Sequence, residues 1–227
     1  SSLNFTGGNF FTSTPGSLGT AIVQLNGGKM FLRSDAGSIF GGTINVAGIA
    51  GSANAGSLTV DRASAAGTGG THTISALSVA DQTLNLVAGN AGYGLAVTGA
   101  TTIGGVSGGT ISNKAAQLTT GSLLLNAPLT VTGTGDTTIG PVGGTGALTL
   151  STSGTVNLTS AAQAGFGSSV ILNTGVVNMN NAASLSGGSA TINGAVRNLG
   201  VANALSNTQT TLLSGFLNAN APFALNG

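Results

Sequence analysis

The side chains that could do chemistry are few and widely spaced in this sequence. Of 227 residues only nine are charged at neutral pH: Lys29, Arg33, Asp35, Asp61, Arg62, Asp81, Lys114, Asp136 and Arg197. His72 is the only histidine, and the chain has no cysteine. Catalytic and metal sites need several such groups held close together. We therefore expect no catalytic residues, no bound cofactor and no enzymatic activity.

Two aspartates have a spacing that suits a metal ion. Asp61 and Asp81 are about 20 positions apart, so they would lie on adjacent turns of a chain that repeats with that period. Stacked carboxylates repel each other unless a cation such as Ca²⁺, which prefers oxygen ligands, bridges them. A calcium site at Asp61 and Asp81 is therefore one hypothesis, although Val60 and Val79 indicate a slightly shorter local register instead.

The remaining polar residues have simpler interpretations. Thr71-His72-Thr73-Ile74 alternates like a strand, which predicts a solvent-facing or locally bonded His72 rather than a catalytic one. Arg33 and Asp35 are typical of a solvated pair in a turn. Asp136 follows Thr-Gly-Thr-Gly, a turn sequence in which an aspartate side chain bonds its own backbone.

The elements that would position these residues follow from a repeat of about 20 residues. When the chain is aligned in rows from Leu148, apolar residues recur at Leu150, Leu172, Ile192 and Leu212, and later in three of the rows at Leu185, Leu205 and Leu225. Each row holds two or three strand-sized runs separated by Gly, Asn or Ser-Gly. Such a unit cannot bury its own apolar side, so neighbouring copies must stack. We therefore predict these two apolar sets as buried columns.

Asparagine recurs in the same rows, at Asn157, Asn178, Asn198 and Asn218. A side-chain amide both donates and accepts hydrogen bonds, so stacked copies predict an asparagine ladder. The adjacent column contains Val156, Val177, Arg197 and Leu217. Because an unpaired guanidinium is unfavourable in an apolar core, we expect that column to face solvent and the asparagines to point inward at the bend.

The whole chain, 1–227, is predicted to be one all-β domain: a single-stranded parallel β-helix, or β-solenoid, of about eleven rungs. The rows are most regular over 148–227 and irregular from about 62 to 147. Near the N-terminus, Gly16-Ser17-Leu18 recurs as Gly37-Ser38-Ile39 and Gly56-Ser57-Leu58, and Phe10-Phe11 recurs as Met30-Phe31. We expect these aromatic residues to fill the core, with a carbohydrate-stacking platform as the alternative.

Charge and hydropathy argue against two further classes of protein. The net charge is +1, whereas nucleic acids and anionic lipids are recognised by clustered positive charge. Mean hydropathy is +0.40, but no run approaches the roughly 18 apolar residues of a spanning helix. We therefore expect neither a nucleic-acid partner nor membrane insertion.

Threonine columns would indicate an ice-binding face. Thr149, Thr191 and Thr211 share one outward position in the aligned rows, but Ile171 interrupts them. Two regular threonine columns over many turns are not visible in the sequence.

Rows such as GVVNMNNAASLSGGSATINGAV, over 175–196, and GLAVTGATTIGGVSGGTI, over 94–111, resemble the passenger regions of large bacterial surface proteins. They are similar to the filamentous-haemagglutinin-like and autotransporter β-strand-repeat families. The resemblance covers most of the chain and rests on composition and period rather than on a diagnostic motif. It implies an exported surface rod of a Gram-negative bacterium that serves as an adhesin, stalk or matrix fibre.

Together these observations lead us to expect a non-enzymatic extracellular rod with a structural or adhesive role. It would be a fibre-forming or surface-presented segment of a larger exported protein. Its expected partners are further copies of itself, end to end or edge to edge, and a host or cell-surface glycan. The alternatives are a polysaccharide-processing β-helix enzyme, which would need clustered acids on one face, and an ice- or glycan-binding solenoid.

Overall fold

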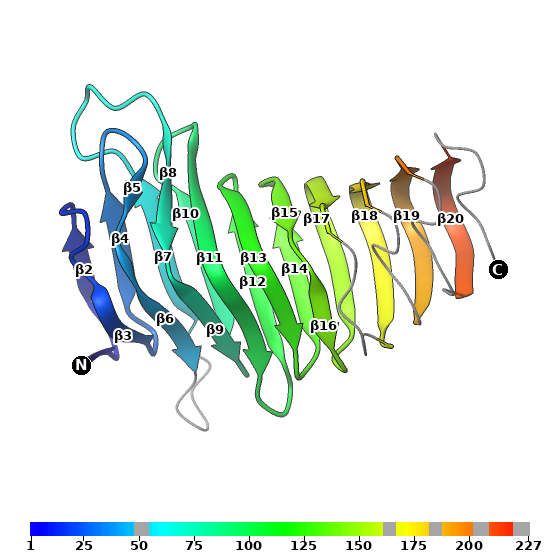
Figure 1. Cartoon of the computed structure of the whole chain (residues 1–227), viewed down its shortest axis with the longest axis horizontal. Helices are drawn as coiled ribbons and strands as arrows, with labels where there is room; N and C mark the ends of the chain where they lie inside the picture. The colour runs from blue at the N-terminus through cyan, green and yellow to red at the C-terminus, as the bar shows by residue number, and fades with distance from the viewer. Residues whose placement is uncertain (48–54, 161–166, 182–187, 202–208, 220–227) are drawn as a thin grey trace.

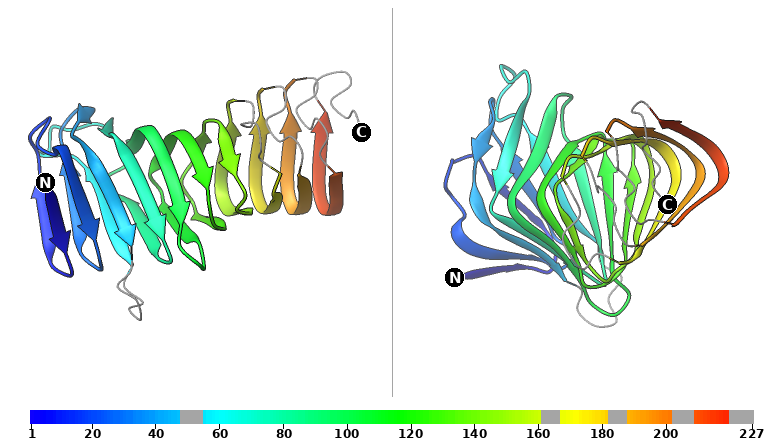
Figure 2. Two further views of the ribbon diagram at one scale, coloured as in Figure 1. Left: turned by 60° about the horizontal axis from the view of Figure 1, so that its bottom comes forward. Right: turned by 45° about the vertical axis from the view of Figure 1, so that its right-hand side comes forward.

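The chain winds into a rod with the N-terminal residues at one end and residues 209–219 at the other (Figure 1). The structure is a computed structural model that describes residues 1–47, 55–160, 167–181, 188–201 and 209–219. Its strands pair in parallel and form one continuous sheet. The predicted all-β parallel solenoid is confirmed, but it has about nine turns instead of eleven. Figure 2 shows the turns stacked along the rod.

Three stacks of strands form the sides of the rod, and we call them faces A, B and C. Face A contains β1 (Ser2–Phe5), β3 (Gly19–Leu25), β6 (Gly41–Ala47), β9 (Ala76–Ala80), the second halves of β11 (Tyr93–Gly104) and β13 (Gln117–Leu125), and β16 (Val142–Gly144). Face C contains β5 (Ser38–Ile39), β8 (Gly70–Ile74), the first halves of β11 and β13, β15 (Thr137–Ile139) and the second halves of the last four strands.

Face B is the longest described stack. It contains β2 (Asn9–Thr12), β4 (Lys29–Arg33), β7 (Gly56–Asp61), β10 (Thr83–Ala88), β12 (Gly109–Lys114), β14 (Leu129–Gly133) and the first halves of β17 (Leu148–Leu158), β18 (Ser169–Met179), β19 (Ser189–Leu199) and β20 (Gln209–Ala219). One turn of the chain therefore visits faces B, C and A in that order.

The length of a turn changes along the rod. After β14 the turns are short, as the register pairs Leu129–Leu148 and Leu148–Val170 show. The turns between β4 and β12 are longer, because Met30 pairs with Leu58 and Leu58 pairs with Leu86. The predicted period therefore holds in the C-terminal part and in the first turn, where Phe10 pairs with Met30. Loops inserted between strands lengthen the turns from β4 to β12 and reduce the number of turns.

The long turns overturn one part of the predicted N-terminal register. Phe10 does pair with Met30, as expected. However, Ser38 pairs with His72 on face C, while Ser57 pairs with Lys29 on face B. The motifs Gly37-Ser38-Ile39 and Gly56-Ser57-Leu58 are therefore on different faces, and the spacing between them is not a turn of the solenoid.

Apolar side chains fill the interior because alternate residues of each strand point inward. Leu150, Leu172 and Ile192 are buried in one column, as predicted. Leu212 continues that column but is 52% exposed, because β20 is the last described strand and no described turn covers it. The second predicted column, Leu185, Leu205 and Leu225, lies outside the described residues.

Arg197 lies in the interior, contrary to the prediction. It pairs with Val177 and Leu217 in an inward column, and its side chain has no exposed surface. Its Nε donates to Met179 Sδ at 3.1 Å, while Nη1 and Nη2 have no partner among the described residues. Burial lowers the pKa of Arg197 to about 10. Strand alternation decided the orientation: the flanking columns of Val196 and Asn198 are the outward ones, so residue 197 had to point inward.

Glycine permits the sharp bend between the two halves of the last strands. Gly175 has a φ of +86°, and a Cβ at that position would collide with the carbonyl oxygen of Thr152. The left-handed backbone and the close approach of the neighbouring turn both require the absence of a side chain. Among the described residues, no helix has the length and apolar character needed to cross a membrane.

Candidate functional site

The predicted asparagines form a hydrogen-bonded ladder on the outside of face C. Asn178 Nδ2 donates to Asn157 Oδ1 at 2.8 Å, Asn198 donates to Asn178 at 2.8 Å and Asn218 donates to Asn198 at 3.0 Å. The first three side chains are half-buried by one another, and Asn218 is exposed. The expectation that they point inward is wrong, because the apolar residues on either side of each asparagine occupy the interior.

A threonine column on face B is longer than the sequence indicated. The members of this column are paired in register from one turn to the next. They are Thr83, Thr110, Thr130, Thr149, Ile171, Thr191 and Thr211. The sequence alignment does not include the first three threonines because they precede the rows aligned from Leu148. The long turn between Thr83 and Thr110 also departs from the period of those rows. The neighbouring outward column contains asparagine and serine as well as threonine, at Asn85, Ser112, Thr132 and Ser151. It is therefore not the second regular threonine column that an ice-binding face would need.

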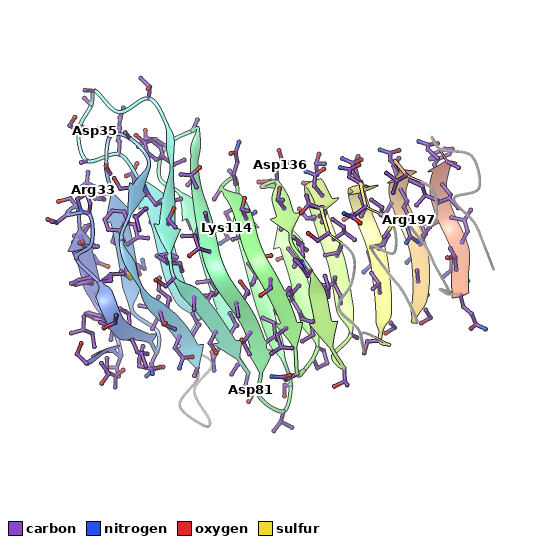
Figure 3. The ribbon with its side chains drawn as sticks, in the orientation of Figure 1. Arg33, Asp35, Asp81, Lys114, Asp136 and Arg197 are labelled. Carbon is purple, nitrogen blue, oxygen red and sulfur yellow. The ribbon has the colours of Figure 1, made fainter. Side chains whose placement is uncertain are left out.

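Five of the nine charged residues lie between positions 29 and 62. Lys29 begins β4, and the other four lie at the corner between faces B and C near the N-terminus. The loops that join β4 to β5 and β7 to β8 project together at this corner (Figure 1). Figure 3 shows Arg33 and Asp35 at this end of the rod, with Lys114 and Arg197 progressively farther along it. Lys114 and Arg197 are therefore far along the rod from Arg33.

Arg33 and Asp35 bind the loop that follows β7 and do not bind each other. Asp35 accepts hydrogen bonds from the backbone N–H and the hydroxyl of Ser64, both at 2.6 Å. These bonds, the hydroxyl bond first, lower the pKa of Asp35 below 3.8. Arg33 Nε donates to the carbonyl oxygen of Arg62 at 3.0 Å. The predicted turn pair is therefore replaced by two contacts that hold the projecting loops together.

His72 is buried beneath this corner, so the expectation of a solvent-facing residue is wrong and that of a locally bonded residue is right. Its Nε2 lies 2.8 Å from the carbonyl oxygen of Asp61, and its ring packs edge-on against Phe40, with centroids 5.3 Å apart. Tyr93 packs on its other side and donates to the carbonyl oxygen of Asp35 at 3.1 Å. Burial lowers the pKa of His72 below 6.5, because the charged ring loses its hydration.

The structure does not bring Asp61 and Asp81 together, so their predicted pairing is wrong. Asp61 ends β7 on face B, where Asn90 Nδ2 donates to its Oδ1 at 2.6 Å. Asp81 follows β9 at the corner between faces A and B, where its Oδ1 accepts from the N–H of Ser107 at 2.6 Å. The two residues belong to one turn but to different corners of it. Among the described residues, no three His, Asp or Glu side chains gather in a group that could hold a metal ion.

Asp136 bonds the next turn instead of its own backbone, which corrects the predicted turn interaction. Its Oδ1 accepts from the N–H of Thr155 at 2.8 Å. The same residue's carbonyl oxygen accepts from the N–H of Leu118 on the preceding turn at 2.9 Å. Asp136 therefore joins three successive turns on face C.

Two hollows border face B. The larger, of about 360 Å³, is an open groove at the corner of Asp81, beside Thr83, Thr110 and Thr130. The smaller, of about 140 Å³, is bordered by Phe11, Thr12, Ser13, Arg33 and Ala63. The first offers hydroxyls and one carboxylate, whereas the second combines an aromatic ring with a guanidinium. Sequence reasoning missed both, because each is assembled from different turns.

Phe11 and Phe31 point outward next to the smaller hollow, so the expectation that they fill the core is wrong. Their rings stack with centroids 4.4 Å apart and an angle of 15° between their planes, and Phe11 is 54% exposed. Met30 and Leu32 on β4 are the fully buried residues of these two strands. The alternation of β4 explains the difference, since Met30 and Leu32 point inward and Phe31 must point outward.

These features define the class of protein: a parallel β-solenoid with polar ladders on its outer faces and an aromatic and charged corner near one end. Such solenoids are compatible with structural and with binding roles. Comparison with known proteins gives no match to this chain, whether among family models, curated proteins or solved structures.

Proposed function

We propose that this chain is a non-enzymatic structural and adhesive rod that extends by strand pairing at its ends. In this proposal it is part of a larger protein exported to the outer surface of a Gram-negative bacterium, in keeping with its resemblance to adhesin passenger regions. A solenoid provides length and stiffness from a short repeat, because every turn contributes one inter-strand spacing of about 4.8 Å.

The observation that carries the proposal is the open edge of the sheet at β20. Within the described residues β20 pairs only with β19. Its apolar side chains Leu212, Leu213 and Phe216 are 52%, 66% and 69% exposed. An edge strand with free N–H and C=O groups and exposed apolar side chains is a template for a further strand.

The opposite end of the rod offers a complementary edge. Among the described strands β2 pairs only with β4, and β1 pairs only with β3. Leu3 and Ile22 on this end are 40% and 42% exposed. Joining unlike edges of two copies gives a head-to-tail contact that repeats without closing, which produces a filament.

Charge does not protect the C-terminal edge. Lysines and inward-pointing charges are common ways to prevent edge pairing, yet no charged residue follows Arg197 in the sequence. Arg197 itself is buried one turn below the edge. This supports a strand partner at β20, from a second copy or from a longer chain.

Sedimentation velocity of the purified chain tests the proposal. The wild type should form species whose size increases with concentration in the micromolar range. The double variant Leu213→Lys, Phe216→Lys should remain a monomer, because two lysines on β20 oppose pairing. Val106→Lys is the matched control, since Val106 is 95% exposed in the loop after β11, and it should assemble like the wild type. A wild-type chain that stays monomeric for days would contradict self-assembly.

A further inference from the structure

The outer side of β2 and β4 presents an aromatic surface to solvent. Phe11 stacks on Phe31 across one turn, and more than half of Phe11 is exposed. An exposed aromatic ring forfeits the free energy of burial, so an outward pair of this kind indicates a surface that is covered by a ligand. The flat face of a ring carries a negative quadrupole that attracts polarised C–H groups, such as those on one side of a pyranose sugar.

A positioned guanidinium borders the same surface. Arg33 ends β4, and its Nε is held by the carbonyl oxygen of Arg62 at 3.0 Å. Within the described residues its two terminal nitrogens have no hydrogen-bond partner and it forms no ion pair. Two terminal N–H groups of a fixed guanidinium match the two oxygens of a carboxylate.

The nearby carboxylates form no ion pair with Arg33, although Asp61 is its register partner on β7. Asp35 is bound by Ser64, and Asp61 accepts from Asn90 and from the N–H of Arg62. Lys29 lies on the same outward side of β4, two residues before Phe31. Three cations, Lys29, Arg33 and Arg62, outnumber Asp35 and Asp61 in this part of the rod, so the surface near Phe11 keeps a net positive charge.

We propose that this hollow binds an acidic sugar, a uronic or a sialic acid residue of a glycan. The sugar ring stacks on Phe11 and its carboxylate binds Arg33, with the Ser13 hydroxyl at the rim of the hollow as a further partner. The hollow has a volume of about 140 Å³ and is bordered by these side chains, so in this proposal it receives the carboxylate edge of one sugar residue while the ring lies against Phe11. The inference rests on the adhesive part of the proposed function and names the ligand class and the site.

Calorimetric titration of the full chain with defined oligosaccharides tests the proposal. Tetragalacturonic acid and sialyllactose represent the two sources of a sugar carboxylate, maltotetraose is the neutral control, and acetate supplies a carboxylate without a ring. At least one acidic sugar should bind tenfold more tightly than maltotetraose and acetate. Arg33→Gln and Phe11→Ala should each weaken that binding at least tenfold.

Lys114→Gln is the matched control variant. Lys114 is an exposed cation in the same outward column of face B as Phe31, three turns farther along, and its loss should leave the affinity unchanged. Equal affinity for acidic and neutral sugars, no binding of any sugar, or equal losses in Arg33→Gln and Lys114→Gln would overturn the proposal. Sedimentation of the same samples distinguishes the failure of the sugar site from the failure of the proposed function. A chain that assembles without binding an acidic sugar refutes the sugar site but not the self-assembling rod.

Discussion

Replacing Arg197 by methionine should stabilise the C-terminal turns. Arg197 is fully buried, and its two terminal nitrogens have no partner among the described residues. Its pKa falls to about 10, below the ordinary value for arginine, because burial disfavours the charged form. The shift corresponds to about 3 kcal/mol. Because the folded-state pKa is the lower one, this cost is present in full below pH 10 and decreases only as the pH rises above that value.

The expected gain is smaller than the full cost. The Arg197→Met change also removes the contact of Nε with Met179 Sδ and alters packing in the column of Val177 and Leu217. Replacing buried ionic groups by apolar ones stabilises other proteins by about 1–4 kcal/mol, and we therefore expect a gain of about 2 kcal/mol.

Hydrogen exchange of the β19 amides is the appropriate assay, because repeat proteins open locally and a single global unfolding energy is not well defined for them. A gain of about 2 kcal/mol slows exchange roughly 30-fold. Lys114→Met removes an exposed cation and should leave exchange in β19 unchanged. Faster exchange in Arg197→Met would refute the reasoning, because it would mean that the guanidinium has a compensating partner in solution.

Three further predictions concern the ladder, the bend and the buried histidine. Asn178→Ala removes two ladder bonds and should destabilise β18 by about 1–2 kcal/mol in hydrogen exchange, whereas the exposed Asn180 should tolerate alanine; equal effects would argue against the ladder. Gly175→Ala should cost about 2 kcal/mol or more in the same assay, since its φ is +86° and the added Cβ would collide with the carbonyl oxygen of Thr152; Gly104→Ala, with nothing within 4 Å, should be nearly neutral. The melting temperature should fall as pH drops below 6.5, because the unfolded chain takes up a proton that buried His72 resists; a melting temperature independent of pH between 8 and 5 would contradict its burial.

The C-terminal turns could be predicted from the sequence because their period is nearly constant. Asn157, Asn178 and Asn198 recur at almost equal spacing, and the structure pairs them in register. The interior position of Leu172 and Ile192 followed from the same alignment. A constant period brings identical residues into contact, so the residue types alone identified the ladder.

The N-terminal turns could not be predicted because loops between the strands change their length. Lys29 pairs with Ser57 across a long turn. A search of the sequence at the period of the C-terminal turns does not find that pairing. Phe31 and Arg197 lie on the side of their strands opposite to the predicted one for a related reason. Hydrophobicity favours an inward Phe31 and an outward Arg197, while strand alternation imposes the reverse. The hollow proposed to bind an acidic sugar depends on both effects, since it joins Phe11, Arg33 and Ala63 from separate turns.

Disulfide trapping across the long turn tests the stacking on which both proposals depend. The chain has no cysteine, so two introduced cysteines can pair only with each other. Lys29 and Ser57 are register partners, with Cα atoms about 4.8 Å apart, within the range that a disulfide bridges. Thr59 lies two positions after Ser57 on β7, so its Cα atom is about 8 Å from that of Lys29. The Lys29→Cys, Ser57→Cys variant should oxidise to an intramolecular disulfide and the Lys29→Cys, Thr59→Cys variant should not, as read by mobility on a non-reducing gel. A bridge in the second variant and none in the first would contradict the long turn and the register that it sets.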